Sequence, residues 1–233
     1  MKIKIPYCSG EPKYWFDIKG WLIFFNISLD ELILDTMQPR WDSSLLYSNG
    51  LQVLERHVLA LEDRYYFKHK GIDYRAVWRI LRQILKNKRI GGMSTIEQQY
   101  VRTYLNRRER TFGRKFNELM LAWLLSHRVN KIRILRTYLS CAYFGYKLNG
   151  CDSASNRLFG KASNELDERE AALVASLLVY PMPKSIVFAE NLIFLLHICD
   201  IDRFFTEAYK ISPRWSYNIR KRMEFSLSLL GHS

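Results

Sequence analysis

The chain has 233 residues, enough for one large domain or a domain with a small lobe, and its apolar content of 48% can supply a sizeable core. Its four cysteines are scattered, and none lies in a Cys-x-x-Cys pair, which excludes a disulfide-stapled scaffold and argues against a zinc or redox motif. The formal net charge of +13 favours a polyanionic partner. Nucleic acid, anionic lipid headgroups and a phosphorylated substrate all satisfy that condition.

Apolar runs in this sequence are short, whereas a membrane-spanning helix needs roughly 18 residues or more. The two longest candidates stop at Asn26 and contain His197, respectively. The first residues include two lysines but no apolar segment behind them. The sequence therefore predicts neither a transmembrane anchor nor a secretory signal.

Amphipathic helical periods dominate the chain, so the sequence predicts a mainly α fold. Residues 1–50 mix aromatic residues with turn signals and are expected to be irregular. A first core helix over about 51–63 is expected to deliver Glu62 to a loop. A second helix begins at Asp73 and runs to about residue 89, with an apolar face and a basic face. Such a helix is typical of a solvated surface or of a membrane surface.

The middle of the chain carries two more predicted helices. Ser94 or Thr95 is expected to cap the first of them, and the second spans about 113–129. The apolar positions of that second helix are predicted to face inward: Phe116, Leu119, Met120, Trp123 and Leu124.

Helical signals continue in the last third of the chain. Asp167 and Glu170 form a capping-box pattern that opens an apolar helix. Residues 185–212 show no clear period, and a basic helix is expected over about 214–230.

Glu62, Asp63 and Arg64 place two carboxylates beside a cation at the end of an apolar helix. A carboxylate there suits a general base that deprotonates a sugar hydroxyl, and the competing interpretation is a solvated surface ion pair. His69 follows as a possible donor to a substrate, or as a residue that fills a turn.

A second group of polar residues suits the binding of phosphate and sugar hydroxyls at a helix start, and comprises Ser94, Thr95, Gln98 and Gln99. Cations follow in numbers that can neutralise a pyrophosphate, namely Arg102, Arg110, Arg114 and Lys115. A second carboxylate, Glu118, comes directly after them.

These segments resemble the ordered motifs of the peptidoglycan glycosyltransferases, the family of monofunctional transglycosylases and of the amino-terminal domains of bifunctional penicillin-binding proteins. The motif Glu-Asp-x-x-Phe-x-x-His-x-Gly-x-Asp is matched from Glu62 to Asp73, with Tyr66 at the aromatic position. The motif Gly-Gly-Ser-Thr-Ile-Thr-Gln-Gln appears from Gly92, and Arg-Lys-x-x-Glu is intact at 114–118. Later motifs match as far as Pro181.

The resemblance implies a lysozyme-like helical domain that polymerises lipid II. Its glycosyltransferase core would span about 51–184, with a membrane-facing lobe within about 74–93, and residues 185–233 would be a divergent extension with a final basic helix. Glu62 would be the base that takes the proton from the acceptor 4-hydroxyl, in a displacement that inverts configuration and releases undecaprenyl pyrophosphate. Glu118 would position the pyrophosphate, directly or through a divalent cation.

The remaining expectations also follow from the resemblance. Asp63, Arg64 and His69, with the polar and cationic groups above, would bind substrate. The cofactor would be Mg²⁺ or Mn²⁺, with no organic cofactor. The partners would be lipid II, the growing glycan strand, an anionic membrane surface and other cell-wall synthesis proteins. The protein would act peripherally on the extracytoplasmic face of the bacterial inner membrane.

Several positions depart from the family pattern. Met93 replaces a glycine, Glu97 a threonine and Arg102 a lysine, so that Glu97 is expected to add negative charge near the phosphate site. A catalytically weakened scaffold that binds lipid II or glycan is therefore an alternative. A lytic enzyme is another, but it needs an acid for the glycosidic oxygen rather than a group of arginines. Nucleic-acid binding would explain the net charge without explaining the two glutamates, and is not expected.

Overall fold

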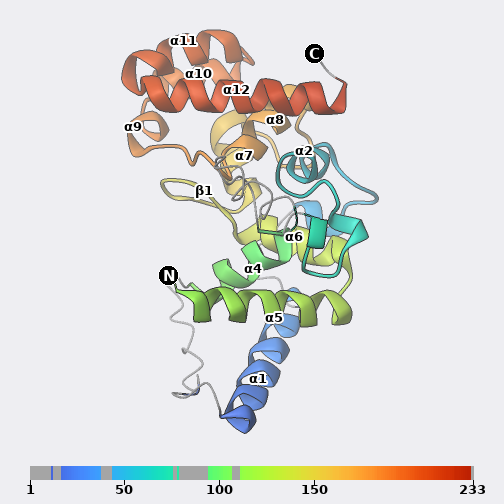
Figure 1. Cartoon of the computed structure of the whole chain (residues 1–233). Helices are drawn as coiled ribbons and strands as arrows, with labels where there is room; N and C mark the ends of the chain where they lie inside the picture. The colour runs from blue at the N-terminus through green and yellow to red at the C-terminus, as the bar shows by residue number, and fades with distance from the viewer. Residues whose placement is uncertain are drawn as a thin grey trace. The chain divides into compact units, whose positions relative to one another are not determined.

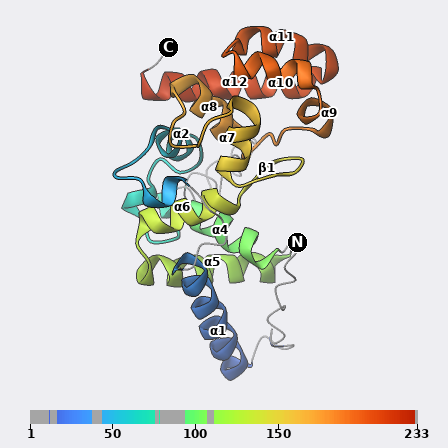
Figure 2. The same cartoon turned by 180° about the vertical axis from the view of Figure 1, so that it is seen from behind.

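The computed structural model describes residues 12, 17–37, 44–75, 78, 94–106 and 111–231. Within these ranges the chain is mostly helical, and the sheet is a two-stranded antiparallel hairpin (Figure 1; Figure 2). The prediction of a mainly α, lysozyme-like domain is confirmed. The chain divides into two compact units, formed by residues Met1–Pro39 with Tyr65–Tyr138 and by residues Arg40–Arg64 with Leu139–Ser233.

Among the residues that the structure describes, the first unit contains four α-helices and a 3-10 turn: α1 (Ile18–Met37), η2 (Tyr66–Lys68), α4 (Ile96–Leu105), α5 (Phe112–Arg128) and α6 (Lys131–Cys141), whose last turn passes into the second unit. Both α1 and α4 pack against α5. Thr95 caps α4 by accepting a hydrogen bond from the Gln98 amide, and Thr111 caps α5 by accepting one from the Arg114 amide. The predicted cap at Ser94 or Thr95 is therefore confirmed at Thr95.

The expectation that residues 1–50 are irregular is wrong for residues 18–37, which form α1. This helix buries Phe24, Leu29 and Leu32, and its Phe25 ring packs edge-on against Phe116 at 6.4 Å. The turn signals that suggested irregular structure flank this segment rather than interrupt it. Tertiary packing of its apolar side supports the helix.

The predicted helix over 113–129 is confirmed as α5, but its inward face was predicted wrongly. Phe116 and Trp123 are 53% and 38% exposed, whereas Asn117 and Glu118 are buried with Leu121 and other residues on that side of the helix. Apolar periodicity selected the wrong face because the buried face carries the polar side chains of Asn117 and Glu118.

The second unit contains a 3-10 turn, a hairpin and seven whole α-helices among the residues that the structure describes: η1 (Ser44–Tyr47), α2 (Val53–Glu62), β1 (Tyr143–Gly145), β2 (Leu148–Asn149), α7 (Cys151–Phe159), α8 (Glu168–Ser176), α9 (Lys184–Val187), α10 (Glu190–His197), α11 (Ile201–Ile211) and α12 (Pro213–Leu230). The predicted core helix ending at Glu62 and the predicted last basic helix are confirmed as α2 and α12. The capping box of Asp167 and Glu170 is present at the start of α8. Helix α12 packs on both α8 and α2.

Residues 185–212, which showed no clear period, form most of α9 together with α10 and α11. The buried positions of α11 are Ile201, Phe204, Phe205 and Ala208. This spacing is a helical stripe on one face, and α10 buries Leu192, Ile193, Leu195 and Leu196 at a similar spacing. The helical period was therefore present, but it was divided between two short helices.

The predicted membrane-facing lobe lies mainly outside the described residues, which include only 74, 75 and 78 beyond Asp73. There the Asp73 carboxylate accepts a hydrogen bond from the Arg75 amide at 3.0 Å, as expected of a helix cap. In the part of the chain that the structure describes, no helix combines the length and the apolar character needed to cross a membrane.

Candidate active site

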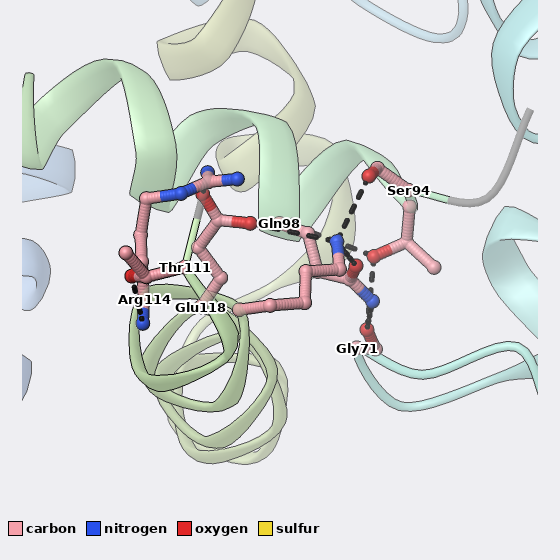
Figure 3. Close-up of polar contacts among 8 residues, drawn as sticks. Gly71, Ser94, Gln98, Thr111, Arg114 and Glu118 are labelled. Carbon is pink, nitrogen blue, oxygen red and sulfur yellow. Dashed lines mark hydrogen bonds and ion pairs between the residues drawn. The ribbon is translucent and has the colours of Figure 1, made fainter. Parts of the chain in front are cut away.

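The second and third motifs meet at one ammonium group in the first unit. The Lys115 Nζ on α5 donates to Ser94 Oγ at 3.0 Å and to Gln98 Oε1 at 2.9 Å. Figure 3 shows Ser94 and Gln98 facing Arg114 and Glu118 across the space between α4 and α5. Helix packing thus brings together residues that the sequence places about twenty positions apart.

Glu118 is only 1% exposed and is surrounded by cations. Its Oε1 accepts from Arg114 Nη1, and its Oε2 lies 3.4 Å from Lys115 Nζ. Burial lowers the pKa of Lys115 below its ordinary value of 10.5, and the positive charges of Arg102 and Arg114 lower it further, whereas Glu118 acts in the opposite direction. Arg114 and Lys115 at Glu118, with Arg102 close enough to act on Lys115, leave a net positive site that suits an anion such as a pyrophosphate.

Gly71 of the first motif joins this arrangement through its carbonyl oxygen. That oxygen accepts from Thr95 Oγ1 at 2.8 Å and from Gln98 Nε2 at 3.0 Å (Figure 3). Gly71 has φ +74°, and a Cβ there would lie 2.3 Å from the Ala122 carbonyl oxygen. The motif needs glycine because both the backbone conformation and the close approach to α5 exclude a side chain.

Glu62, the predicted base, belongs to the second unit and is the last residue of α2. Its Oε1 accepts from Arg222 Nη2 on α12, and the same guanidinium nitrogen lies 3.5 Å from the Leu61 carbonyl oxygen. The Glu62 side chain is 11% exposed, so it is not a solvated surface acid.

The two residues after Glu62 have different surroundings. Asp63 is 7% exposed, and its amide closes α2 by donating to the Leu59 carbonyl. Arg64 folds back along α2, with its Nε donating to the Ala60 carbonyl at 3.0 Å and its guanidinium 5.5 Å from the centre of the Phe225 ring.

Two predicted ligands point elsewhere than the Lys115 ammonium. The Gln99 side chain accepts from Tyr138 Oη at 2.7 Å in a buried contact between α4 and α6. His69 lies beside Tyr66, with ring centres 6.2 Å apart, and lines a cavity of about 410 Å³. Among the predicted cations, Arg102 is exposed on α4 and Arg110 lies outside the described residues. Substrate binding by these four residues stays a prediction.

Glu97, which was expected to add negative charge near the predicted phosphate site, is paired with a cation instead. It is fully buried, forms an ion pair with Lys131 of α6, and accepts from Ser126 Oγ at 3.5 Å. The Lys131 ammonium also lies 4.2 Å from the centre of the Tyr66 ring. The acid that replaces the family threonine is therefore matched by a cation within the same unit.

The described residues do not form an oxygen cage for a divalent cation at Glu118, because Arg114 and Lys115 face its two oxygens. A second possible pair of metal ligands is Glu97 and His69, because a carboxylate oxygen of Glu97 lies within 4.8 Å of a ring nitrogen of His69. Lys131 pairs with Glu97 there. The divalent cation stays a prediction.

Lys131 and Arg222 were not predicted as site residues. Each contacts an acid far away in the sequence, and only the fold reveals the pairing. The substitution of threonine by Glu97 was the available signal for Lys131, since a buried acid calls for a partner. Arg222 offered no signal beyond its place in a basic helix.

Comparison with known proteins gives the family directly. The sequence pattern of the transglycosylase family matches residues 30–192. Penicillin-binding protein 1A of Neisseria flavescens is 36% identical over 130 residues, which are 54% of this chain and 16% of that protein. The protein of the same name from Clostridium tetani is 32% identical over 173 residues, 72% of this chain and 21% of that protein. The chain thus spans about a fifth or less of the length of these curated relatives, and it belongs to the peptidoglycan transglycosylase family.

Proposed function

We propose that this protein is an inverting peptidoglycan glycosyltransferase that polymerises lipid II into glycan strands and releases undecaprenyl pyrophosphate. The observation that carries the proposal is the convergence of Ser94, Gln98 and Glu118 on the Lys115 ammonium beside Arg114. A lytic enzyme has no use for such a cationic site, whereas the departure of a lipid-linked pyrophosphate requires stabilisation of developing negative charge.

Each motif then has a chemical role. Glu62 accepts the proton of the acceptor 4-hydroxyl as that oxygen attacks the anomeric carbon of the lipid-linked donor. The bond between the anomeric carbon and the pyrophosphate oxygen breaks, and the electron pair leaves with the pyrophosphate. Arg114, Lys115 and Arg102 neutralise that anion, while Glu118 holds the first two in place.

The proposed setting is the extracytoplasmic face of the bacterial inner membrane, with the protein at an anionic membrane surface. Two features support it. The formal net charge is +13, and α1 exposes several large apolar side chains, namely Ile18, Leu22, Ile23, Ile27, Leu34 and Met37. Both suit attraction to anionic headgroups and contact with their acyl boundary. Association with other cell-wall synthesis proteins is part of the same proposal.

Polymerisation of purified lipid II, followed by gel separation of the glycan products, tests the function. We expect wild-type protein to form polymer and Glu62→Gln to form none while retaining its helical circular dichroism and a cooperative unfolding transition. Active Glu62→Gln protein would overturn the role of Glu62 as base. Wild-type protein that binds lipid II without forming polymer under any divalent-cation condition would instead support the scaffold alternative.

A further inference from the structure

An arginine from the last helix contacts the predicted base. Arg222 Nη2 donates to Glu62 Oε1 and lies 3.5 Å from the Leu61 carbonyl oxygen. The two side chains are 20% and 11% exposed, so water screens their interaction only partly. Arg222 lies beyond residue 192, where the match to the family pattern ends.

The helix that carries Arg222 is fixed on the helix that carries Glu62. One turn after Arg222, the Ser226 hydroxyl is hydrogen-bonded to His57 Nδ1 of α2 at 2.7 Å, and both residues are fully buried. The other nitrogen of His57 contacts Glu168 Oε2 of α8 at 2.8 Å. Because α12 is anchored through these contacts, a packed helix and not a loop carries the guanidinium.

The buried face of α12 adds apolar anchoring around the same point. Ile219 and Met223, on either side of Arg222 in the sequence, are 0% and 3% exposed. On the outer side, Phe225 lies under the Arg64 guanidinium at 5.5 Å. Helix α12 is thus part of the core of the second unit, which argues against a contact that opens and closes by detachment of the helix.

We propose that Arg222 is a positioning residue for Glu62. By holding one carboxylate oxygen while bound to a packed helix, the guanidinium fixes the side-chain rotamer of the base and so the direction from which it meets the acceptor hydroxyl. A base acts only within hydrogen-bond reach of its proton, and a misplacement of about 1 Å can slow a reaction roughly 10²-fold. The planar guanidinium suits this task because it cannot lose its charge and donates in fixed directions.

This inference rests on the proposed function of Glu62, and the first experiment separates the two. Wild type, Arg222→Gln and Arg222→Lys are compared in lipid II polymerisation, with Arg220→Gln as the matched control. Arg220 lies on the same helix, is 48% exposed and pairs with Glu224. We expect Arg222→Gln to lower kcat about 10²-fold with KM changed less than about twofold. Arg222→Lys should recover part of that loss, and Arg220→Gln should behave as wild type.

An unchanged or raised kcat in Arg222→Gln would overturn the positioning role, and a raised kcat would indicate that the contact restrains the enzyme. The role would also be overturned if folded Arg222→Lys protein had a kcat no higher than that of Arg222→Gln. If Arg222→Gln fails to fold, Arg222→Lys alone decides, with reduced kcat and wild-type KM expected. Absence of polymer from wild-type protein would count against the proposed function instead. In that case a double-mutant cycle of unfolding with Glu62→Gln and Arg222→Gln still measures the contact, and no coupling between the two would overturn it.

Discussion

Glu97 on α4 and Lys131 on α6 form a buried ion pair, with side chains 0% and 12% exposed. The acid occupies a position where the family pattern has threonine, and its charge is matched by Lys131 within the same unit. An unmatched acid beside the cations of α5 would weaken binding of an anion, so the pair removes the main sequence-based objection to activity.

Removal of one partner of this pair should destabilise the protein strongly. Lys131→Met leaves Glu97 buried without its cation, and we expect a loss of roughly 3–5 kcal/mol in the free energy of unfolding. Urea denaturation followed by circular dichroism measures it. The double variant Glu97→Thr with Lys131→Met should recover most of the loss, because neither charge then remains.

Matching control variants separate this effect from the loss of any lysine. Lys210, 66% exposed in α11 and paired with Glu207, provides one, and Lys210→Met should change stability by less than about 1 kcal/mol. Additive losses in the Glu97 and Lys131 cycle would contradict the pairing.

Gly71 should tolerate no side chain. In Gly71→Ala the new Cβ meets the backbone of Ala122 at 2.3 Å and the residue must keep φ +74°, so we expect destabilisation of at least about 2 kcal/mol. Thermal unfolding checks it. Gly160 is the comparison, since it has φ +66° but nothing within 4 Å of its Cβ position, and Gly160→Ala isolates the cost of the backbone conformation. Equal losses at the two positions would show that the close approach to α5 is unimportant.

The helices that could be predicted from the sequence are those with local start signals. Thr95 and the pair Asp167 and Glu170 specify their caps within three or four residues, and α4 and α8 begin where those signals predict. Helix α1 has a start signal as well, because the Asp17 carboxylate accepts a hydrogen bond from the Gly20 amide at 2.9 Å, but the turn signals on either side of the helix concealed it. Its packing against α5 is recorded by no local pattern.

The residues of the candidate site could be predicted from the sequence where they belong to motifs that follow one another along the chain. Ser94, Gln98 and Lys115 converge as expected, because each lies on a helix start or an α5 face that the motif order specifies. Gln99 follows Gln98 directly, and a step of about 100° around the helix turns it toward Tyr138 instead. Sequence spacing could not reveal which of two adjacent glutamines faces the Lys115 ammonium.

Loss of the Lys115 ammonium should impair turnover more than stability. In Lys115→Met the contacts to Ser94, Gln98 and Glu118 disappear, and we expect kcat/KM for lipid II to fall roughly 10²–10³-fold. Arg128→Gln, at the exposed end of the same helix, should leave the rate unchanged. A rate loss of less than about tenfold in folded Lys115→Met protein would remove Lys115 from the proposed phosphate site.

A divalent cation is expected to enter with the substrate. Because Arg114 and Lys115 face both oxygens of Glu118, the protein alone should bind Mn²⁺ weakly, as calorimetry or electron paramagnetic resonance can measure. Polymerisation should nevertheless cease in EDTA and return with Mg²⁺ or Mn²⁺. Full activity in EDTA would exclude a requirement for a divalent cation. Tight Mn²⁺ binding in the absence of lipid II would instead show that the protein alone contains a preformed metal site.

Asp152 should make the second unit sensitive to acid. Burial alone would raise the pKa of its carboxyl, but hydrogen bonds from Ser163 and Ser44 outweigh burial and lower the pKa below its ordinary value of 3.8. Both serines donate backbone amides to it, at 2.7 and 2.8 Å. In the pH range below 3.8 the unfolded chain binds a proton more readily than the folded protein does, so the stabilisation is present above that pH and is lost as pH falls through the folded-state pKa.

The variant Asp152→Asn tests this directly, because it removes the charge while nearly keeping the shape. We expect it to be less stable than wild type at pH 7, and the difference in the free energy of unfolding should shrink as pH falls below about 4. Asp202→Asn, at an exposed ion pair in the same unit, should show a small difference at every pH. If the difference in the free energy of unfolding between wild type and Asp152→Asn stays constant down to about pH 3, the serines hold the carboxyl by geometry alone and not through its charge.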